Sequence, residues 1–201
     1  MFDSGLYGAA VIFVVTIGAS LIGLYSQPAL IDKSLFRPYW FLRRRQYDTI
    51  YMSGFVHADL GHLIFNMVTF YFFAFDTERF LGTLKFLALY FVGLVVSHTC
   101  TYLRHKNNPE YASLGASGAI SAVLFAYVVY FPTTTLVILP LPIPIPAALF
   151  AVAYVAYSYW AGKRQVGRIN HDAHLCGALS GIAFVAATDP AAIGRLAGLL
   201  G

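Results

Sequence analysis

Side chains that could take part in catalysis are concentrated in four short stretches of this sequence. They are 57–66 with His57, His62 and Asn66; 115–118 with Gly115, Ser117 and Gly118; 170–174 with His171 and His174; and 76–82 with Asp76, Glu78 and Arg79. Ser117 offers a hydroxyl nucleophile, and His174 offers an imidazole that could take its proton. His62 and Asn66 are four residues apart, so on a helix they share one face and could donate hydrogen bonds to an oxyanion. Together these residues have the chemistry of a serine hydrolase.

Each stretch has a simpler interpretation when it is taken alone. A serine between glycines is typical of a helix-packing site, and so are Gly177 and Gly181 after His174. His62 and Asn66 could form a hydrogen-bonded pair between helices. We expect His57 and His171 in loops at the membrane interface, and the 76–82 stretch to serve a structural turn. No His-Glu-x-x-His signature is present, so we expect no metal site and no cofactor.

The composition indicates an integral membrane protein. Of the 201 residues, 59% are apolar and only 11% are charged, where soluble domains carry roughly 25% charged residues. The net charge of +4 comes without the mixture of basic and aromatic residues that would suggest nucleic-acid binding, so the expected partner is the lipid bilayer. A transporter or channel would be expected to carry an intramembrane carboxylate or an inverted repeat, and neither is visible.

The apolar blocks predict a single all-α domain over residues 1–201 with six membrane-spanning helices. The expected spans are about 4–25, 60–75, 86–103, 114–131, 147–161 and 173–188. Residues 111–162 contain no Asp, Glu, Lys, Arg or His, and this length is too great for one helix. Pro132 and the alternating prolines from Pro140 to Pro146 therefore mark a break between the fourth and fifth spans.

The order of the spans predicts that the catalytic candidates meet. In a six-span bundle the second, fourth and sixth helices run in the same direction, so their first turns lie at the same face of the membrane. His62 and Asn66 lie in the first turns of the second span, Ser117 in the first turn of the fourth, and His174 in the first turn of the sixth. We therefore expect these four side chains at similar depth.

The motifs that carry these residues resemble those of the rhomboid family of intramembrane serine proteases, and the resemblance covers about residues 5–188. The matching positions are His57, His62 and Asn66; Gly115, Ser117 and Gly118; Ala173, His174, Gly177 and Gly181; and Glu78 in the turn after the second span. The resemblance implies a six-helix bundle of rhomboid type.

The resemblance also implies a function. Ser117 and His174 would form a catalytic dyad, and His62, Asn66 and the Ser117 backbone N–H would hold the oxyanion. The substrates would be transmembrane segments of other proteins, and the fifth span with the loop that follows it would move to admit them. The alternative is a rhomboid-like protein that binds membrane proteins without cutting them. The sequence leaves the oligomeric state open.

Two departures from the family pattern concern the imidazole and the orientation in the membrane. Some relatives carry an aromatic residue one helical turn after the serine, where this chain has Ser121, so Tyr154, Tyr157 or His171 could orient His174 instead. Ten of the 13 basic residues fall in the first, third and fifth loops, which by the positive-inside rule would put the catalytic face in the cytoplasm. The family resemblance implies the cell membrane with the catalytic face outside, and this is our prediction. Cys100 and Cys176 lie at the edges of apolar blocks, and no disulfide can be argued from them.

Overall fold

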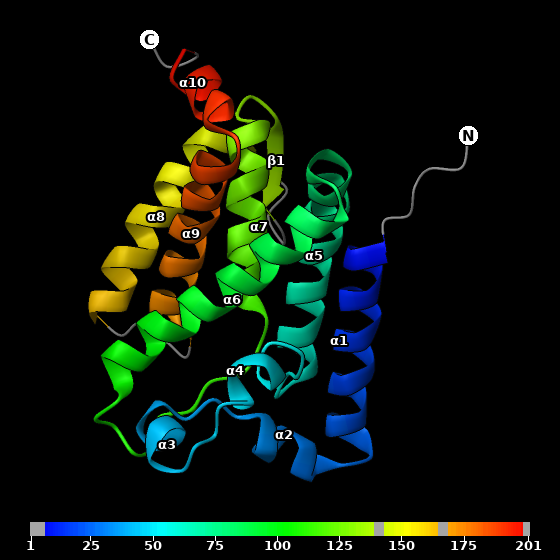
Figure 1. Ribbon diagram of the computed structural model, residues 1–201, viewed down its shortest axis with the longest axis vertical. Helices are drawn as coiled ribbons and strands as arrows, with labels where there is room; N and C mark the ends of the chain where they lie inside the picture. The colour runs from blue at the N-terminus through cyan, green and yellow to red at the C-terminus, as the bar shows by residue number, and fades with distance from the viewer. Residues whose placement is uncertain (1–6, 139–142, 165–168, 199–201) are drawn as a thin grey trace.

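The computed structural model describes residues 7–138, 143–164 and 169–198 (Figure 1). Over these residues the chain is mostly helical. Its helices are α1 (Tyr7–Tyr25), α2 (Pro28–Ser34), α3 (Pro38–Arg43), α4 (Thr49–Met52), α5 (Leu60–Leu81), α6 (Thr83–His105), α7 (Ser117–Tyr130), α8 (Ala147–Arg164), α9 (His171–Thr188) and α10 (Pro190–Gly198). The strands are β1 (Thr135–Ile138) and β2 (Ile143–Pro146).

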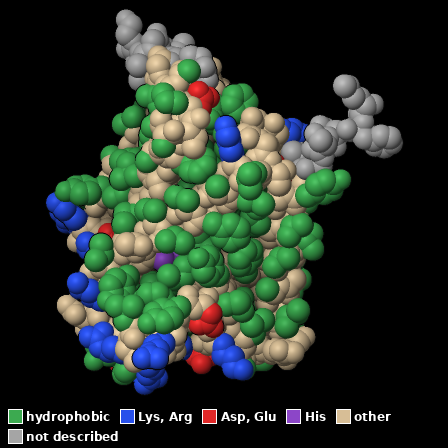
Figure 2. Space-filling view, viewed as in Figure 1, with side chains coloured by type: hydrophobic (Ala, Val, Ile, Leu, Met, Phe, Trp, Pro, Cys, Tyr) green, Lys and Arg blue, Asp and Glu red, His purple; other side chains and the backbone are tan. Residues whose placement is uncertain are grey.

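The surface and two helices have the character of a membrane protein. In the described part of the chain, α1 and α6 are the helices both long and apolar enough to cross a bilayer, while α7 is apolar but shorter, at 14 residues. Hydrophobic side chains cover much of the face in Figure 2, and Lys and Arg gather at its lower end and one edge. The arrangement of six spans remains a prediction.

Helices α5 to α9 each differ from the expected spans at one end or both. Helix α6 is longer than 86–103, α7 is shorter than 114–131, and α8 continues three residues beyond 161. The first described residue of α1 is Tyr7, so residues 4–6 of the first expected span lie outside the described residues. Helix α5 continues six residues beyond 75 and ends before Gly82, whose φ of 79° reverses the chain at low steric cost. Helix α9 starts at His171 because the side chain of Asn170 accepts a hydrogen bond from the backbone N–H of Ala173 at 3.1 Å.

A small antiparallel hairpin corrects the all-α expectation. Strand β1 pairs with β2 between α7 and α8, with Thr135 opposite Pro146 and Ile138 opposite Ile143. Proline has no N–H to donate, which bars it from the interior of a helix but is tolerated in a strand with a free edge. The prolines thus break the helix as predicted, but two of them do so within a strand; Pro140 and Pro142 lie outside the described residues.

Glu78 joins the end of α5 to the beginning of α1. Its side chain is 1% exposed, and its two carboxylate oxygens accept hydrogen bonds from the backbone N–H groups of Gly8 and Ala9 at 2.9 and 2.8 Å. The hydroxyl of Thr83 donates to the same carboxylate at 2.6 Å. The first N–H groups of a helix have no hydrogen-bond partner within that helix. The carboxylate of Glu78 therefore satisfies two donors of α1 that would otherwise be buried without a partner.

Helix α7 forms the centre of the molecule. It packs against α5, α6 and α9 (Figure 1), and almost all of its side chains are buried. Glycines bring the backbones together: a Cβ on Gly93 of α6 would lie 2.5 Å from the Cβ of Ala122, and one on Gly181 of α9 would lie 2.1 Å from the carbonyl oxygen of Ala122. Helices α6 and α9 therefore hold α7 closely from two sides.

Candidate active site

The loop before α7 presents Ser117 at the first position of that helix. Gly115 has a φ of 113°, a conformation that disfavours side chains, and its N–H donates to the carbonyl of Ser53 at 2.8 Å. A Cβ on Gly115 would lie 2.6 Å from Cε1 of His62 and 3.5 Å from Nδ2 of Asn66. The backbone just before Ser117 thus runs directly against the two predicted oxyanion donors.

A close contact between α7 and α9 brings His174 to the same region. A Cβ on Gly177 would lie 2.1 Å from the carbonyl oxygen of Gly118, and a Cβ on Gly118 would lie 3.4 Å from the carbonyl oxygen of Ala173. Ser117 precedes Gly118 and His174 follows Ala173, so the two residues flank this contact. The starts of α5, α7 and α9 lie together, as the parity of the helices predicts.

Ser117 and His174 flank the contact between α7 and α9, but their side chains are not hydrogen-bonded to each other in the described part of the chain. Among the hydrogen bonds of residues 7–138, 143–164 and 169–198, none joins these two side chains. Catalytic hydrogen bonds are often long in ligand-free structures and shorten when substrate binds. Ser117 also lines a small cavity of about 20 Å³ together with Ser97, His98, Thr101 and Asn170, which has room for a single water molecule.

A chain of hydrogen bonds fixes the amide of Asn66. Its Nδ2 donates to Nε2 of His57 at 2.8 Å, Nδ1 of His57 contacts the hydroxyl of Ser20 at 3.0 Å, and that hydroxyl donates to the carbonyl of Phe55 at 3.3 Å. His57 must be neutral to accept from Asn66. Burial lowers the pKa of His57 from 6.5 to about 3, with a further contribution from His62, which keeps the ring in that form at physiological pH.

Two rings, those of Tyr154 and His171, pack near the imidazole of His174. The ring of Tyr154 on α8 is nearly parallel to it, at an interplanar angle of 13° and a centroid distance of 6.3 Å. The ring of His171 meets it at 73° and 6.3 Å, and Tyr157 packs edge-on against His171 at 5.5 Å. Of the three candidates that the sequence offered for orienting His174, Tyr154 is the one whose face is turned toward it.

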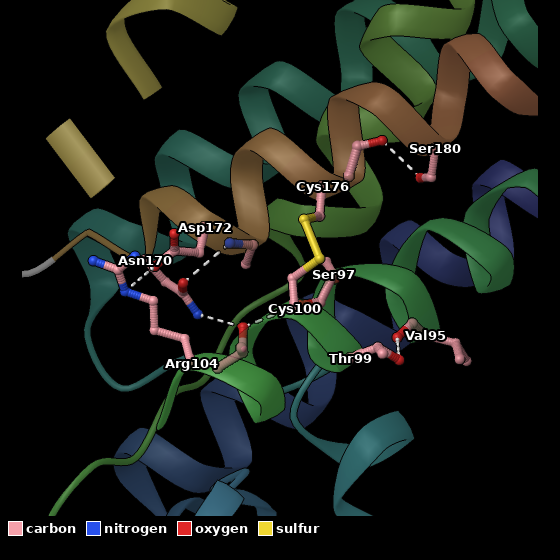
Figure 3. Close-up of a disulfide and its surroundings, with 12 residues drawn as sticks. Val95, Ser97, Thr99, Cys100, Arg104, Asn170, Asp172, Cys176 and Ser180 are labelled. Carbon is pink, nitrogen blue, oxygen red and sulfur yellow. Dashed lines mark hydrogen bonds and ion pairs between the residues drawn. A yellow bond between two sulfur atoms is a disulfide. The ribbon is translucent and has the colours of Figure 1, made fainter. Parts of the chain in front are cut away.

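Three contacts tie the start of α9 to the end of α6, as Figure 3 shows. A disulfide joins Cys100 to Cys176, with 6.5 Å between the two Cα atoms. Arg104 pairs with Asp172 at 3.2 Å, and its guanidinium also donates to the carbonyl of Gly162 on α8 at 2.6 Å. Asn170 donates to the hydroxyl of Thr101 at 2.9 Å. These contacts, called the α6–α9 clasp below, lie beside the helical turn that carries His174.

The expected position in a loop is confirmed for His57 and wrong for His171. His57 lies in a loop but is completely buried, because Ser20 and Asn66 bond both of its ring nitrogens. His171 is the first residue of α9 and is 4% exposed, packed against Tyr157, so it does not lie in an interfacial loop. The sequence left the disulfide open, since pairing across 76 residues depends on how α6 and α9 pack.

Comparisons with known proteins agree with the motifs. A family model described as the Rhomboid domain matches residues 44–189. The presenilin-associated rhomboid-like protein, mitochondrial, of Homo sapiens is 35% identical over 136 residues, which are 67% of this chain and 36% of that protein. The presenilin-associated rhomboid-like protein A, mitochondrial, of Danio rerio is 34% identical over 136 residues, which are again 67% of this chain and 36% of that protein. The RHOMBOID-like protein 12, mitochondrial, of Arabidopsis thaliana is 28% identical over 145 residues, 65% of this chain and 43% of that protein. The chain thus spans well under half of these relatives.

Proposed function

The chain belongs to the rhomboid family, and on this premise we propose that it is an intramembrane serine endopeptidase that uses a dyad of Ser117 and His174. One observation carries the proposal: the glycine contact between α7 and α9, which Ser117 and His174 flank. The two residues come from different helices, so only a very close approach of the backbones could let an imidazole reach the serine hydroxyl.

In the proposed reaction the hydroxyl oxygen of Ser117 attacks the carbonyl carbon of the scissile peptide bond while His174 takes the hydroxyl proton. His174 then gives this proton to the departing amine, and the acyl group stays on Ser117. A water molecule, deprotonated by His174, attacks the acyl carbon. The bond from that carbon to the Ser117 oxygen then breaks, His174 returns the proton to this oxygen, and the new carboxyl terminus is released. The proposed reaction steps require no cofactor or metal.

The oxyanion of each tetrahedral intermediate would be held by His62, Asn66 and the backbone N–H of Ser117. Asn66 has two amide hydrogens, and His57 accepts only one of them, so the other is free to donate. Because Nδ2 is fixed by that bond, the amide cannot turn its oxygen toward the intermediate. Donors that are already oriented stabilise the developing charge without reorganisation, which is the largest contribution in many hydrolases.

The substrates of this reaction would be transmembrane segments of other proteins. The family acts within the bilayer, and the helix α8 beside the site has large exposed apolar side chains such as Leu149 and Val152, which suit contact with lipid. Substrate identity follows from neither the fold nor the relatives, whose sequences extend well beyond this chain.

We place the catalytic face on an extracytoplasmic side, in keeping with the prediction of a cell-membrane protein, although the relatives are named mitochondrial. The disulfide Cys100–Cys176 lies at the same end of the molecule as the site, and disulfides persist in oxidising compartments. The arginines of the first loop are weaker evidence for a cytoplasmic catalytic face than their number suggests. Arg43 and Arg44 lie over the rings of Tyr39 and Trp40 at 4.0 and 3.8 Å, an arrangement suited to the interface.

Labelling with a fluorophosphonate probe tests the dyad. The purified protein in detergent should react at Ser117, and both Ser117→Ala and His174→Ala should abolish the reaction. Ser26→Ala, at an exposed residue just after α1, is the matched control and should label normally. Cleavage of a transmembrane substrate should show the same pattern. A folded wild-type protein that neither labels nor cleaves any substrate would favour the alternative, a rhomboid-like binder of membrane proteins.

Cysteine labelling on intact cells tests the orientation. The native cysteines are paired, so single cysteines can be introduced by Asn107→Cys in the loop between α6 and α7 and by Lys85→Cys at the opposite end of α6. A membrane-impermeant maleimide should label the first variant from outside and the second only after permeabilisation. The reverse pattern would put the catalytic face in the cytoplasm.

A further inference from the structure

We infer that Tyr154 is a positioning residue that joins both members of the dyad and sets the plane of the His174 ring. The inference rests on the proposed function, and it assigns a role to a side chain of α8 that none of the sequence motifs contains. Tyr154 reaches His174 with its ring and Ser117 through its hydroxyl.

The first half of this link is the ring of Tyr154, which lies nearly parallel to the imidazole. In the described part of the chain, the hydrogen bonds include none to the ring nitrogens of His174; the residue's backbone N–H bonds to the carbonyl of Asn170. Rotation of the imidazole about its side-chain bonds must therefore be limited by packing. Tyr154 limits it on one face and His171 meets it with an edge.

The second half of the link is the hydroxyl of Tyr154, which lies 2.8 Å from the hydroxyl of Ser121. Ser121 donates its own proton to the carbonyl oxygen of Ser117 at 2.9 Å. A hydroxyl has a single proton, so Tyr154 must be the donor and Ser121 the acceptor in the first bond. The resulting chain runs from Tyr154 through Ser121 to the backbone of the nucleophile.

Neighbouring side chains hold Tyr154 in this position. Phe125 of α7 and Phe150 of α8 pack against its ring at centroid distances of 5.2 and 5.6 Å. Ser121 is small and 4% exposed, and its hydroxyl contacts the hydroxyl of Tyr154 at the same place. Because Tyr154 belongs to α8, a displacement of α8 would remove its ring from His174 and its hydroxyl from Ser121 together.

Kinetics of two variants test the assignment. Tyr154→Leu removes the ring and the hydroxyl, and we expect it to lower kcat by roughly 10- to 100-fold with little change in KM, as misplacement of a catalytic group does. Tyr154→Phe keeps the ring and loses one hydrogen bond, so a reduction of about 3- to 10-fold is expected. Tyr159→Leu, also on α8 but 54% exposed and in contact with Lys163, is the matched control and should stay within about twofold of wild type.

Moving the aromatic ring from α8 to α7 tests whether Tyr154 acts by positioning His174 or only by packing within α8. In the double variant Ser121→Tyr with Tyr154→Ala, α7 supplies the aromatic ring to the space that α8 vacates. We expect its kcat to recover most of what Tyr154→Ala loses, although the covalent attachment of the ring has moved to another helix. This comparison also remains informative if Tyr154→Leu is too unstable to purify.

The outcomes distinguish this inference from the proposed function. Wild-type protein without any fluorophosphonate labelling would contradict the dyad itself. Normal labelling of wild type with an unchanged rate in folded Tyr154→Leu would overturn only the role of Tyr154. An equal loss in Tyr159→Leu, or a rise in KM with unchanged kcat, would also overturn it, because the effect would then belong to α8 packing or to substrate binding.

Discussion

Replacing Gly177 by alanine should separate the two helices that carry the proposed dyad. The added Cβ would lie 2.1 Å from the carbonyl oxygen of Gly118 and 2.8 Å from its carbonyl carbon, and both atoms belong to the backbone. Neither can turn away as a side chain would. Helix α9 must therefore shift relative to α7, and it takes His174 with it.

The size of the shift follows from the geometry. Ordinary van der Waals contact of a Cβ begins at 3.4 Å, so the backbones must part by about 1 Å at Gly177. A misplacement of about 1 Å between catalytic groups can cost on the order of 100-fold in rate. Overpacking of a close interface also costs about 1 to 3 kcal/mol of unfolding free energy. The expected variant is thus folded, less stable and nearly inactive.

The assay compares fluorophosphonate labelling rates and thermal unfolding in the same detergent for wild type and Gly177→Ala. Gly18→Ala is the matched control, since it makes the same substitution inside helix α1 at a site with no heavy atom within 4 Å of the new Cβ. The control should label at the wild-type rate. A Gly177→Ala protein with wild-type labelling and wild-type stability would refute the argument that this contact sets the distance between the dyad residues.

Three further perturbations test the buried groups that support the site. The carboxylate of Glu78 accepts hydrogen bonds from two backbone N–H groups, and Glu78→Gln would turn an amide N–H₂ toward one of them. The unfolding free energy should therefore fall by about 2 kcal/mol. Asp76→Asn, at an exposed residue, should leave the melting temperature unchanged. For His57 the unfolded chain gains a proton near pH 6.5 and the folded protein only near pH 3, so stability should be greatest above pH 6.5 and fall by up to about 1.4 kcal/mol per pH unit below it. Melting curves at pH 7.5 and 5 measure this dependence, and an equally steep decline in His57→Gln would assign it to other groups. Cys100→Ser with Cys176→Ser should lower the unfolding free energy by roughly 2 to 4 kcal/mol, and dithiothreitol should destabilise only the wild type.

The sequence predicted those parts of the site that depend on order along the chain. Ser117, His62 and His174 each stand in the first turns of a helix, and the alternation of helix direction is enough to bring such turns to one face. Gly177 predicted a close helix contact because only a residue without a side chain permits it. These inferences need spacing alone and no knowledge of rotamers.

The remaining parts depend on which sides of two helices meet, and no spacing rule specifies that. Tyr154 is one of three tyrosines on α8 with similar surroundings in the sequence, and its contact with His174 follows from the rotation of α8 about its axis. The pairing of Cys100 with Cys176 likewise depends on how α6 crosses α9. The burial of His57 escaped prediction because its partner Ser20 comes from the distant helix α1.

The supports of His174 constrain different motions, and this explains why an active dyad could do without a third, acidic residue. The contact at Gly177 fixes the distance between α9 and α7. Cys176 lies 200° around the helix from His174, so the α6–α9 clasp holds the opposite side of α9 and limits its rotation. Tyr154 then restricts the ring itself. An acidic partner would orient the imidazole by a hydrogen bond. Here the ring of Tyr154 would do so, on a helix whose distance and rotation are already fixed, without burying another charge in the membrane.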